Sequence, residues 1–312
     1  GGEQMKTAVV TGANGFVGSA LIRELVNNDY KVFAVCSPDR SSNVIDNPSV
    51  KIIYCDISSA ADLKRLIKLE PNECVDCFYH LAWGGSSGDA RFNVDLQLAN
   101  VVNTINCLRA ARDINCKRFI CVGSTTELEA VRALYFTDGE CKDKRYVYGA
   151  AKVACCMFGI QEGERIGIEV VGVILHNVYG IGDYSNRMLN ATIKKCVKGE
   201  TCNFTSGTQN YDFIYIDDAV RGFRLIAENG ITAKVYHIGS SKPRPLKEFL
   251  LELKNSVDTS SQFNFGGIPY NGINLTLKEL DCSVTERDTG FKAGISFAEG
   301  CRRTFEWWKE RE

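Results

Sequence analysis

The sequence feature that most constrains the fold is a glycine-rich turn between an apolar strand and a helix. Residues Thr7–Thr11 predict a buried strand, and residues 16–28 predict a helix with apolar side chains at helical spacing. Glycines in this position allow a tight turn, a close approach to a pyrophosphate and packing of the helix on the strand, while the helix N-terminus favours phosphate. The turn therefore predicts a dinucleotide site, formed by Gly12, Asn14, Gly15, Phe16, Val17 and Gly18.

Strand-like and helix-like segments alternate along the rest of the N-terminal half. Short apolar runs are bounded by turn residues, and the stretches between them carry apolar residues at helical spacing. We expect strands at 31–36, 51–54, 77–81, 118–122 and 169–175, and helices at 63–69, 96–112 and 148–164. This alternation predicts an α/β fold, a doubly wound parallel sheet of the Rossmann type with helices on both faces.

The alternation weakens after about residue 180. Helices are expected at 186–198 and 297–309, and strands at 213–216 and 235–238. Such a segment predicts a smaller C-terminal α/β lobe over the carboxyl ends of the parallel strands, where ligands bind in open α/β sheets. We therefore expect a dinucleotide-binding domain over 1–178 and a substrate-binding lobe over 179–312, with some interleaving of segments.

The overall composition excludes several other classes of protein. Lys and Arg number 37 against 38 Asp and Glu, so the basic excess of a nucleic-acid-binding protein is missing. No apolar run approaches the roughly 20 residues that cross a bilayer, and the N-terminus lacks the apolar region of a signal peptide. We expect a cytoplasmic protein without nucleic-acid or membrane partners.

The cysteines suggest neither disulfides nor a metal site. The fourteen cysteines are scattered through apolar segments, where a free thiol behaves as a small hydrophobic group. Cys74, Cys77 and His80 follow a Cys-x-x-Cys-x-x-His spacing, but residues 77–80 read as a buried strand rather than a metal-binding loop. We expect no metal.

The glycine spacing, Gly-x-x-Gly-x-x-Gly, resembles the fingerprint of the extended short-chain dehydrogenase/reductase family, of the epimerase/dehydratase type that modifies sugar nucleotides. Further motifs follow in the family's order at successive strand ends: Cys55-Asp-Ile, His80-Leu-Ala-Trp, Asn100-Val, Gly123-Ser-Thr-Thr, Tyr148-Gly-Ala-Ala-Lys, Asn177-Val-Tyr-Gly and Asp212-Phe-Ile-Tyr-Ile-Asp-Asp. The resemblance implies that Asp56 and Ile57 contact the adenine. It also implies a cofactor-binding role for Leu81, Ala82, Trp83 and Asn100.

The end of the second expected strand bears on the choice between NAD and NADP. An acidic residue there would accept a hydrogen bond from the ribose 2′-OH, but position 36 is a cysteine. Ser37 and Arg40 are available for a 2′-phosphate, so NADP is favoured. Asp39 is close enough in sequence to reach the ribose, and NAD remains the alternative.

Tyr148 and Lys152 form the predicted catalytic pair. Four residues apart near a helix start, they project from one face of that helix. The resemblance implies that Tyr148 is the acid/base, that Lys152 favours its phenolate form and binds the nicotinamide ribose, and that Ser124 or Thr125 holds the substrate oxygen. Counting along the strand favours Ser124, whereas alignment on Glu127-Leu128 favours Thr125.

Glu127 bears on the class of reaction. In the family's 4,6-dehydratases, a glutamate two residues after the active threonine removes a proton beside the 4-keto group, and Glu127 has that spacing from Thr125. A solvated loop glutamate is the alternative, and we favour it, because many reductases and epimerases also carry a glutamate nearby.

Substrate-binding residues are predicted in the second half of the chain. The resemblance implies that Asn177 contacts the diphosphate of the substrate. Tyr211 stands where family members commonly carry an arginine, and Arg187 or Arg244 would compensate for the missing guanidinium.

These features predict an NAD(P)-dependent oxidoreductase acting at C4 of a nucleotide-activated sugar. A 4-keto reductase is the leading hypothesis, followed by a 4-epimerase and a 4,6-dehydratase. A binding protein that senses NAD(P) is the alternative from another class, but the Tyr148 and Lys152 pair is intact. By resemblance we also expect a homodimer, formed through the helices at 96–112 and 148–164.

Overall fold

A computed structural model describes residues 5–39, 42–71, 73–135 and 146–312. Its centre is a seven-stranded sheet in the order β11-β6-β5-β4-β1-β2-β3, in which every neighbouring pair is parallel. The strands are β1 (Thr7–Thr11), β2 (Lys31–Cys36), β3 (Val50–Tyr54), β4 (Val75–His80), β5 (Cys116–Ser124), β6 (Glu169–Leu175) and β11 (Val235–Ile238). The chain starts in the middle and winds outward to both edges. This order confirms the predicted doubly wound Rossmann fold.

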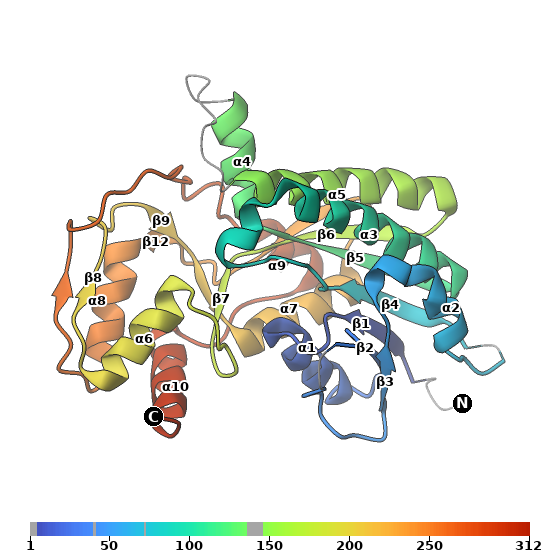
Figure 1. The fold of residues 1–312 in the computed structure, drawn as a ribbon, viewed down its shortest axis with the longest axis horizontal. Helices are drawn as coiled ribbons and strands as arrows, with labels where there is room; N and C mark the ends of the chain where they lie inside the picture. The colour runs from blue at the N-terminus through green and yellow to red at the C-terminus, as the bar shows by residue number, and fades with distance from the viewer. Residues whose placement is uncertain (1–4, 40–41, 72, 136–145) are drawn as a thin grey trace.

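Helices cover both faces of the sheet (Figure 1). On one face α1 (Phe16–Val26) packs beside α7 (Ile216–Asn229). On the other face α3 (Val94–Asp113) and α5 (Tyr146–Ile166) lie side by side, next to a 3-10 turn (Ile57–Asp62) and α2 (Leu63–Leu66). Successive strand residues point to opposite faces, so Val9 and Phe78 join the core under α3 and α5, while Val10 and Tyr79 join the core under α1 and α7. The sheet is thus buried on both sides, as its nearly continuous apolar strands require.

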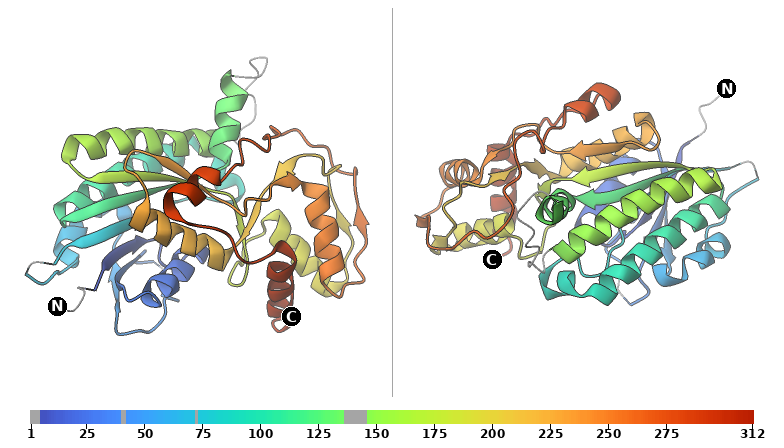
Figure 2. Two further views of the ribbon diagram at one scale, coloured as in Figure 1. Left: turned by 180° about the vertical axis from the view of Figure 1, so that it is seen from behind. Right: turned by 90° about the horizontal axis from the view of Figure 1, so that it is seen from above.

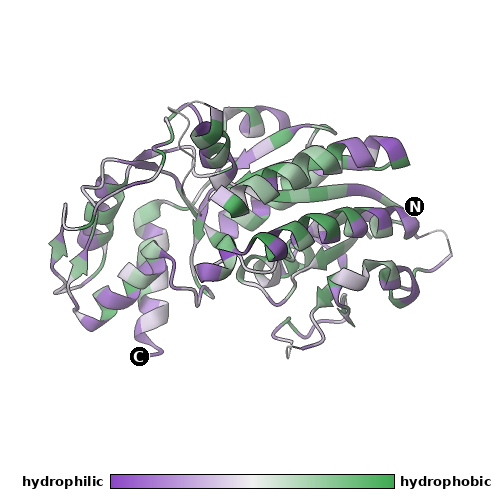
Figure 3. Ribbon diagram, turned by 45° about the horizontal axis from the view of Figure 1, so that its top comes forward, coloured by the Kyte–Doolittle hydropathy of each residue, from purple (hydrophilic) through white to green (hydrophobic). Residues whose placement is uncertain are grey.

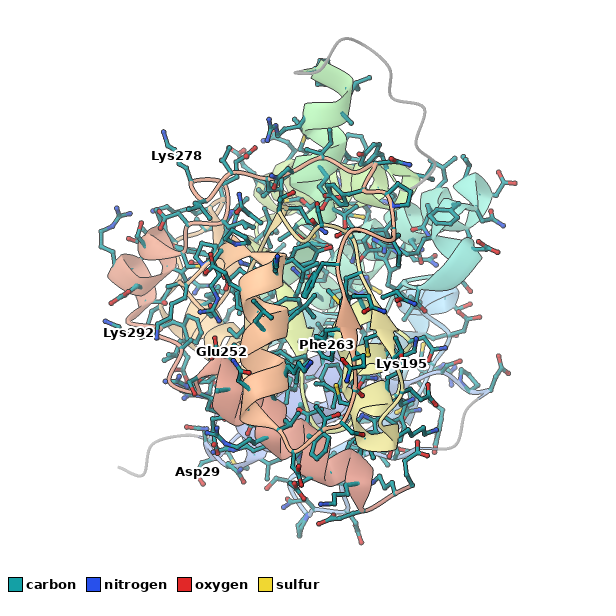
Figure 4. The ribbon with its side chains drawn as sticks, turned by 90° about the vertical axis from the view of Figure 1, so that its left-hand side faces the viewer. Asp29, Lys195, Glu252, Phe263, Lys278 and Lys292 are labelled. Carbon is teal, nitrogen blue, oxygen red and sulfur yellow. The ribbon has the colours of Figure 1, made fainter. Side chains whose placement is uncertain are left out.

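The C-terminal lobe is smaller and lies at one end of the sheet (Figure 2). Its helices are α6 (Met188–Lys198), α8 (Leu246–Ser256) and α10 (Phe297–Lys309). Its strands pair as β7 (Asn177–Tyr179) with β10 (Phe213–Tyr215), β9 (Asn210–Tyr211) with β12 (Arg244–Pro245), and β8 (Cys202–Asn203) with β13 (Phe263–Asn264). The rings of Phe213, Phe249 and Phe297 meet in its core, with centroids 4.8–5.6 Å apart. Figure 4 looks onto this lobe, with Lys195 of α6, Glu252 of α8 and Phe263 of β13 on the near face.

The strand at 235–238 lies in the large sheet, whereas the sequence pattern suggested that it belonged to the smaller lobe. β11 pairs with β6 in parallel register, from Val235 opposite Gly172 to Ile238 opposite Leu175. Helix α7 provides the crossover that a parallel connection needs, and it returns the chain from β10 to the sheet edge. The chain then re-enters the lobe at β12, contributes α9 (Ser283–Thr289) beside α7 and β11, and ends the lobe with α10.

The sequence pattern did not predict α7, α8 or α9, and it missed one further helix. Helix α4 (Thr126–Tyr135) begins directly after β5 and projects from the body of the molecule (Figure 1). Its first turn carries Glu127 and Glu129, which suit the positive end of the helix dipole. In the described residues, no helix is long and apolar enough to cross a membrane.

Candidate active site

The glycine-rich turn has the geometry that its spacing predicted. Gly12 has a φ of +66°, and a Cβ there would lie 2.8 Å from the backbone nitrogen of Ala82. A Cβ on Gly18 would lie 2.2 Å from the carbonyl oxygen of Gly12, so α1 is pressed directly onto the turn. Gly15 is the N-cap of α1 and offers no side-chain cap, and the first turn carries no acidic residue. The first N–H groups of α1 therefore remain for an anion.

Asn14 adds a more specific indication of a ligand. Its Oδ1 accepts hydrogen bonds from the Asn43 backbone nitrogen at 3.2 Å and from the Cys36 thiol at 3.5 Å. Its Nδ2 is buried and has no hydrogen-bond partner among the residues that the structure describes. A buried donor without a partner costs free energy, which a ligand acceptor relieves. Together with Phe16 and Val17 at the start of α1, this turn fits a dinucleotide phosphate group.

The loop after β4 is held by Thr11 at the end of β1 and by Asn100, which was predicted to bind the cofactor. The backbone nitrogen of Ala82 donates to Thr11 Oγ1 at 3.2 Å. Asn100 bonds the loop twice, accepting from the Gly84 nitrogen at 2.9 Å and donating to the Gly84 oxygen at 2.8 Å. Leu81 packs against the core beneath. Asn100 thus fixes the loop rather than presenting a free amide.

The adenine end of the predicted site is more open. Asp56 is exposed and caps the following 3-10 turn by accepting from the Ser58 nitrogen at 2.9 Å, with Ile57 beginning that turn. Ser37 is exposed just beyond β2, while Cys36 is buried at its end. Arg40 lies outside the described residues.

Tyr148 and Lys152 lie together at the start of α5, and Trp83 of the loop after β4 contacts both of them. The Lys152 ammonium donates to the Val122 carbonyl at 2.8 Å and lies 3.5 Å from the centroid of the Trp83 ring. Trp83 and Tyr148 meet edge to face, with centroids 5.8 Å apart. The ammonium is 5.7 Å from the centre of the Tyr148 ring. The predicted pair is thus assembled around one tryptophan.

Arg91 and Thr126 join this cluster, and the sequence analysis missed both. The Arg91 guanidinium carbon lies 4.4 Å from the centroid of the Tyr148 ring, and Nη2 donates to Thr126 Oγ1 at 3.2 Å. Within the described part of the chain, the Arg91 Nε is buried without a hydrogen-bond partner. Arg91 lies in a short 3-10 turn (Gly88–Phe92) with no recognisable motif, so only the folded structure reveals that it reaches α5.

The structure separates the two candidate hydroxyl groups. Ser124 Oγ lies 3.3 Å from Thr126 Oγ1 and is therefore linked through Arg91 to Tyr148. Thr125 is 8% exposed, and its oxygen makes no such link to the cluster in the described residues. This geometry favours Ser124.

Glu127 is not the solvated loop glutamate that we favoured from the sequence. It lies in α4 and is 6% exposed, and its Oε1 accepts from the Ser124 nitrogen at 2.9 Å. A Cβ on Gly123 would lie 1.8 Å from this oxygen, so the glycine makes room for the carboxyl group. Burial raises the pKa of Glu127 to about 7, although the Ser124 N–H and the Lys152 ammonium act in the opposite direction.

The raised pKa of Glu127 makes a testable contribution to stability. The folded protein holds the Glu127 proton up to about pH 7, whereas the unfolded chain releases it near the ordinary pH of about 4.3. Stability from this group is therefore complete below the unfolded pKa and is lost as the pH rises through the folded one. Relative to Glu127→Gln, the wild-type free energy of unfolding should fall by about 3 kcal/mol between pH 4.5 and 8.

Urea denaturation of both proteins across this pH range measures the difference. Glu164→Gln on the exposed side of α5 is the matched control and should run parallel to the wild type. Parallel curves for Glu127→Gln would instead mean that the carboxyl group ionises in the folded protein as it does in the unfolded chain.

The predicted substrate residues lie around the junction with the smaller lobe. Asn177 opens β7, and its backbone nitrogen donates to the Asp212 oxygen at 3.1 Å. The ring of Tyr211 stacks on Phe213 at 5.5 Å, and Tyr211 is directly opposite Arg244 in the β9–β12 pair. Arg187 Nη2 donates to Asp183 Oδ2 at 2.9 Å, and the guanidinium carbon of Arg187 lies 5.6 Å from the ring centre of Phe16 in the glycine-rich turn.

A cavity lies beside Tyr211, one of these predicted substrate residues. It measures about 620 Å³, and its lining includes Phe92, Met188, Phe204, Tyr211 and Tyr270. Phe92 follows Arg91 directly, so one end of the cavity borders the cluster, and Tyr211 lies in the lobe. Its aromatic lining suits a ligand with a flat apolar face.

Known proteins resemble this chain over most of its length. Residues 8–239 match the model of the NAD dependent epimerase/dehydratase family. The dTDP-D-glucose 4,6-dehydratase of Mus musculus is 24% identical over 339 residues, which cover 99% of this chain and 90% of that one. CDP-abequose synthase of Salmonella muenchen is 25% identical over 307 residues, 96% of each chain. The solved structure of UDP-glucose 4-epimerase from Thermotoga maritima with UDP-glucose shares the fold, with a TM-score of 0.79 and 20% identity over 98% of this chain and 99% of that one.

Proposed function

Because the chain belongs to the NAD dependent epimerase/dehydratase family, we propose that it transfers a hydride at C4 of a nucleotide-activated sugar, as a 4-keto reductase. The observation that carries this proposal is the cluster of Tyr148, Lys152 and Ser124 at the carboxyl end of β5, beside the glycine-rich turn. This is the edge at which doubly wound sheets bind their ligands. The intact pair of Tyr148 and Lys152 supports an enzyme over a protein that only senses the dinucleotide.

The residues of this chain supply binding, orientation and proton transfer. A reduced nicotinamide dinucleotide supplies the hydride when bound. The Tyr148 hydroxyl is the proton donor to the C4 oxygen, and the Ser124 hydroxyl holds that oxygen by a hydrogen bond. The Lys152 ammonium and the Arg91 guanidinium place two positive charges beside the Tyr148 ring. The cavity along Tyr211 is the proposed site of the nucleotide, and Arg244 lies opposite Tyr211 in the β9–β12 pair. Asn177 and Arg187 are proposed to contact the substrate as well.

NADP is the proposed cofactor, and the end of β2 carries this choice. Cys36 occupies the position where an acidic residue would bind the ribose 2′-OH. Its thiol donates a hydrogen bond to Asn14 Oδ1 instead. Cys36→Asp should therefore shift the preference toward NAD by at least about tenfold in the ratio of kcat/KM values, or about 1.4 kcal/mol. Cys55→Asp, at the end of β3, is the control and should leave this ratio unchanged. A wild-type enzyme that already prefers NAD would refute the proposal for the cofactor.

The enclosed position of Glu127 argues against a 4,6-dehydratase, whose base must reach the sugar. A 4-epimerase is the second candidate, because it uses the same cluster without a further acid or base. The nucleotide released on denaturation of undialysed protein separates the two: tightly held NAD indicates an enzyme that regenerates its own cofactor, and exchangeable NADPH indicates a reductase. With a 4-keto sugar nucleotide, a reductase consumes one NADPH for each sugar, whereas an epimerase consumes none. Failure to bind either dinucleotide would refute an enzymatic role.

A homodimer through α3 and α5 is also proposed. Val94, Leu98 and Val102 recur at every fourth residue of α3 and are more than half exposed. Met157 and Phe158 of α5 are more than half exposed as well. Figure 3 shows apolar residues along both helices. An apolar face of this kind on two adjacent helices suits a second copy of itself about a two-fold axis.

Light scattering tests the dimer directly. The wild type should scatter as twice the 34.5 kDa of one chain, and Leu98→Glu with Phe158→Glu should give single chains. Leu277→Glu, at an equally exposed leucine of the smaller lobe, is the control and should remain dimeric. A wild type that scatters as a single chain would rule out the proposed interface.

A further inference from the structure

Three side chains with metal-binding atoms meet beside Gly239. His176 follows β6, Asp212 precedes β10 and Cys282 precedes α9, so the three come from distant parts of the chain. Their exposed fractions are 3%, 0% and 2%. The binding atoms, His176 Nδ1, an Asp212 carboxylate oxygen and Cys282 Sγ, all lie within 4.8 Å of one another. No step of the proposed reaction requires these three buried side chains.

The three atoms pack together against Gly239, which directly follows β11. A Cβ on Gly239 would lie 2.1 Å from Asp212 Oδ2, 2.3 Å from His176 Nδ1 and 2.9 Å from Cys282 Sγ. Zinc bonds to oxygen and nitrogen are about 2.0–2.2 Å long, and zinc–sulfur bonds are about 2.3 Å. Because the three atoms already lie within 4.8 Å of one another, small side-chain movements would bring all of them to these distances from one ion. Any side chain at position 239 would collide with all three atoms.

The surrounding groups hold two of these side chains in place. Asp212 Oδ2 accepts from the Ser240 nitrogen at 2.9 Å, and Oδ1 accepts from the Ser240 hydroxyl. His176 Nε2 lies 2.9 Å from His237 Nδ1. Side chains that bind metals are typically oriented by such a second layer of hydrogen bonds, with the free ring nitrogen of the histidine bonded to another group.

The protons balance when an ion replaces the hydrogen bond between His176 and Asp212. Without an ion, His176 Nδ1–H donates to Asp212 Oδ2 at 2.8 Å, and His176 Nε2 accepts from His237 Nδ1–H. With an ion, His176 Nδ1 gives its lone pair to the metal, its Nε2 carries the proton, and His237 is protonated on Nε2. The two rings keep the same number of protons. The thiol proton of Cys282 is the one released to solvent.

We propose that His176, Asp212 and Cys282 form a buried site for a divalent ion of the zinc class, with a water molecule as the fourth ligand. Thiolate and imidazole favour zinc over magnesium or calcium, which prefer oxygen ligands. The ion ties the end of β6, the start of β10 and the start of α9 together. Its role is structural, since the site is separate from the Tyr148 cluster and does not depend on the proposed function. The Cys74, Cys77 and His80 spacing is not involved, because both ring nitrogens of His80 are bonded to threonines.

Cobalt substitution tests the site through its sulfur ligand. Full-length protein is stripped with a chelator under reducing conditions and titrated with Co²⁺ alone. The wild type should show a thiolate-to-cobalt charge-transfer band that saturates at one ion per chain and is abolished by Zn²⁺. Cys282→Ser should lose this band, while the control Cys74→Ser should keep it. No band in the wild type, or an unchanged band in Cys282→Ser, would overturn the proposal.

A second measurement on the wild type does not depend on the folding of a variant. One equivalent of Zn²⁺ should raise the midpoint of thermal unfolding of stripped protein. It should also slow alkylation of Cys282 in moderate urea, relative to Cys74, when modified peptides are mapped by mass spectrometry. Equal alkylation rates with and without Zn²⁺ would show that no ion binds Cys282.

Discussion

Replacing Tyr148 by phenylalanine should lower kcat roughly 10³-fold while leaving dinucleotide affinity within about twofold. The substitution removes only the hydroxyl group that carries the proton. The ring keeps its edge-to-face contact with Trp83 and its contact with the Arg91 guanidinium. The expected result is thus a loss of turnover without a loss of structure.

Steady-state kinetics and calorimetric titration with NADPH measure the two effects separately. Tyr146→Phe is the matched control, because it removes a tyrosine hydroxyl two residues away on a different side of α5. It should keep kcat within about threefold. If Tyr148→Phe retained wild-type turnover, the proton would come from another group and the assignment of the acid/base would be wrong.

Gly18→Ala should have the second largest effect, through the dinucleotide site. The new Cβ would lie 2.2 Å from the carbonyl oxygen of Gly12, and both are backbone elements that no side-chain rotation can separate. Helix α1 must therefore move away from the turn, which takes its first N–H groups out of position for phosphate. We expect at least about a tenfold loss of NADPH affinity, or about 1.4 kcal/mol, together with a loss of roughly 1–3 kcal/mol in stability.

Calorimetry and urea denaturation of the same preparation measure both losses. Gly267→Ala is the control, because no atom of the described residues lies within 4 Å of the Cβ it would add, and it should be close to neutral in both measurements. Unchanged NADPH affinity in Gly18→Ala would show that the dinucleotide does not bind at the glycine-rich turn.

The sequence was sufficient to predict the parts of the fold that depend on local patterns. The strands β1, β2 and β6 were predicted with their observed bounds, because each is an uninterrupted apolar run between turn residues. The turn at Gly12, Gly15 and Gly18 was predicted because its steric requirement is expressed in glycine spacing alone. Helices α3 and α5 were predicted within two residues at each end.

Features that depend on distant contacts were beyond the sequence. The place of β11 in the large sheet depends on the crossover by α7, and its four residues carry no sign of their partner. The burial of Glu127 depends on the absence of a side chain at Gly123, which reads as an ordinary strand glycine. Arg91 and Thr126 are 35 positions apart in the sequence, and only the folded chain brings them together beside Tyr148. The group of His176, Asp212 and Cys282 spans more than a hundred residues of sequence, so it too becomes visible only in the folded chain.

The chain passes back and forth between the large sheet and the smaller lobe, and this limits how the protein can change. After β6 it builds part of the lobe, returns for α7 and β11, builds more of the lobe with β12, α8 and β13, and ends there with α10. The lobe is built from several separate segments of the sequence, so it cannot be exchanged between relatives as one continuous segment. A new substrate range must instead arise through replacements in several short segments. The two parts should also melt together, because the last strand of the sheet is added only after the chain has passed through the lobe.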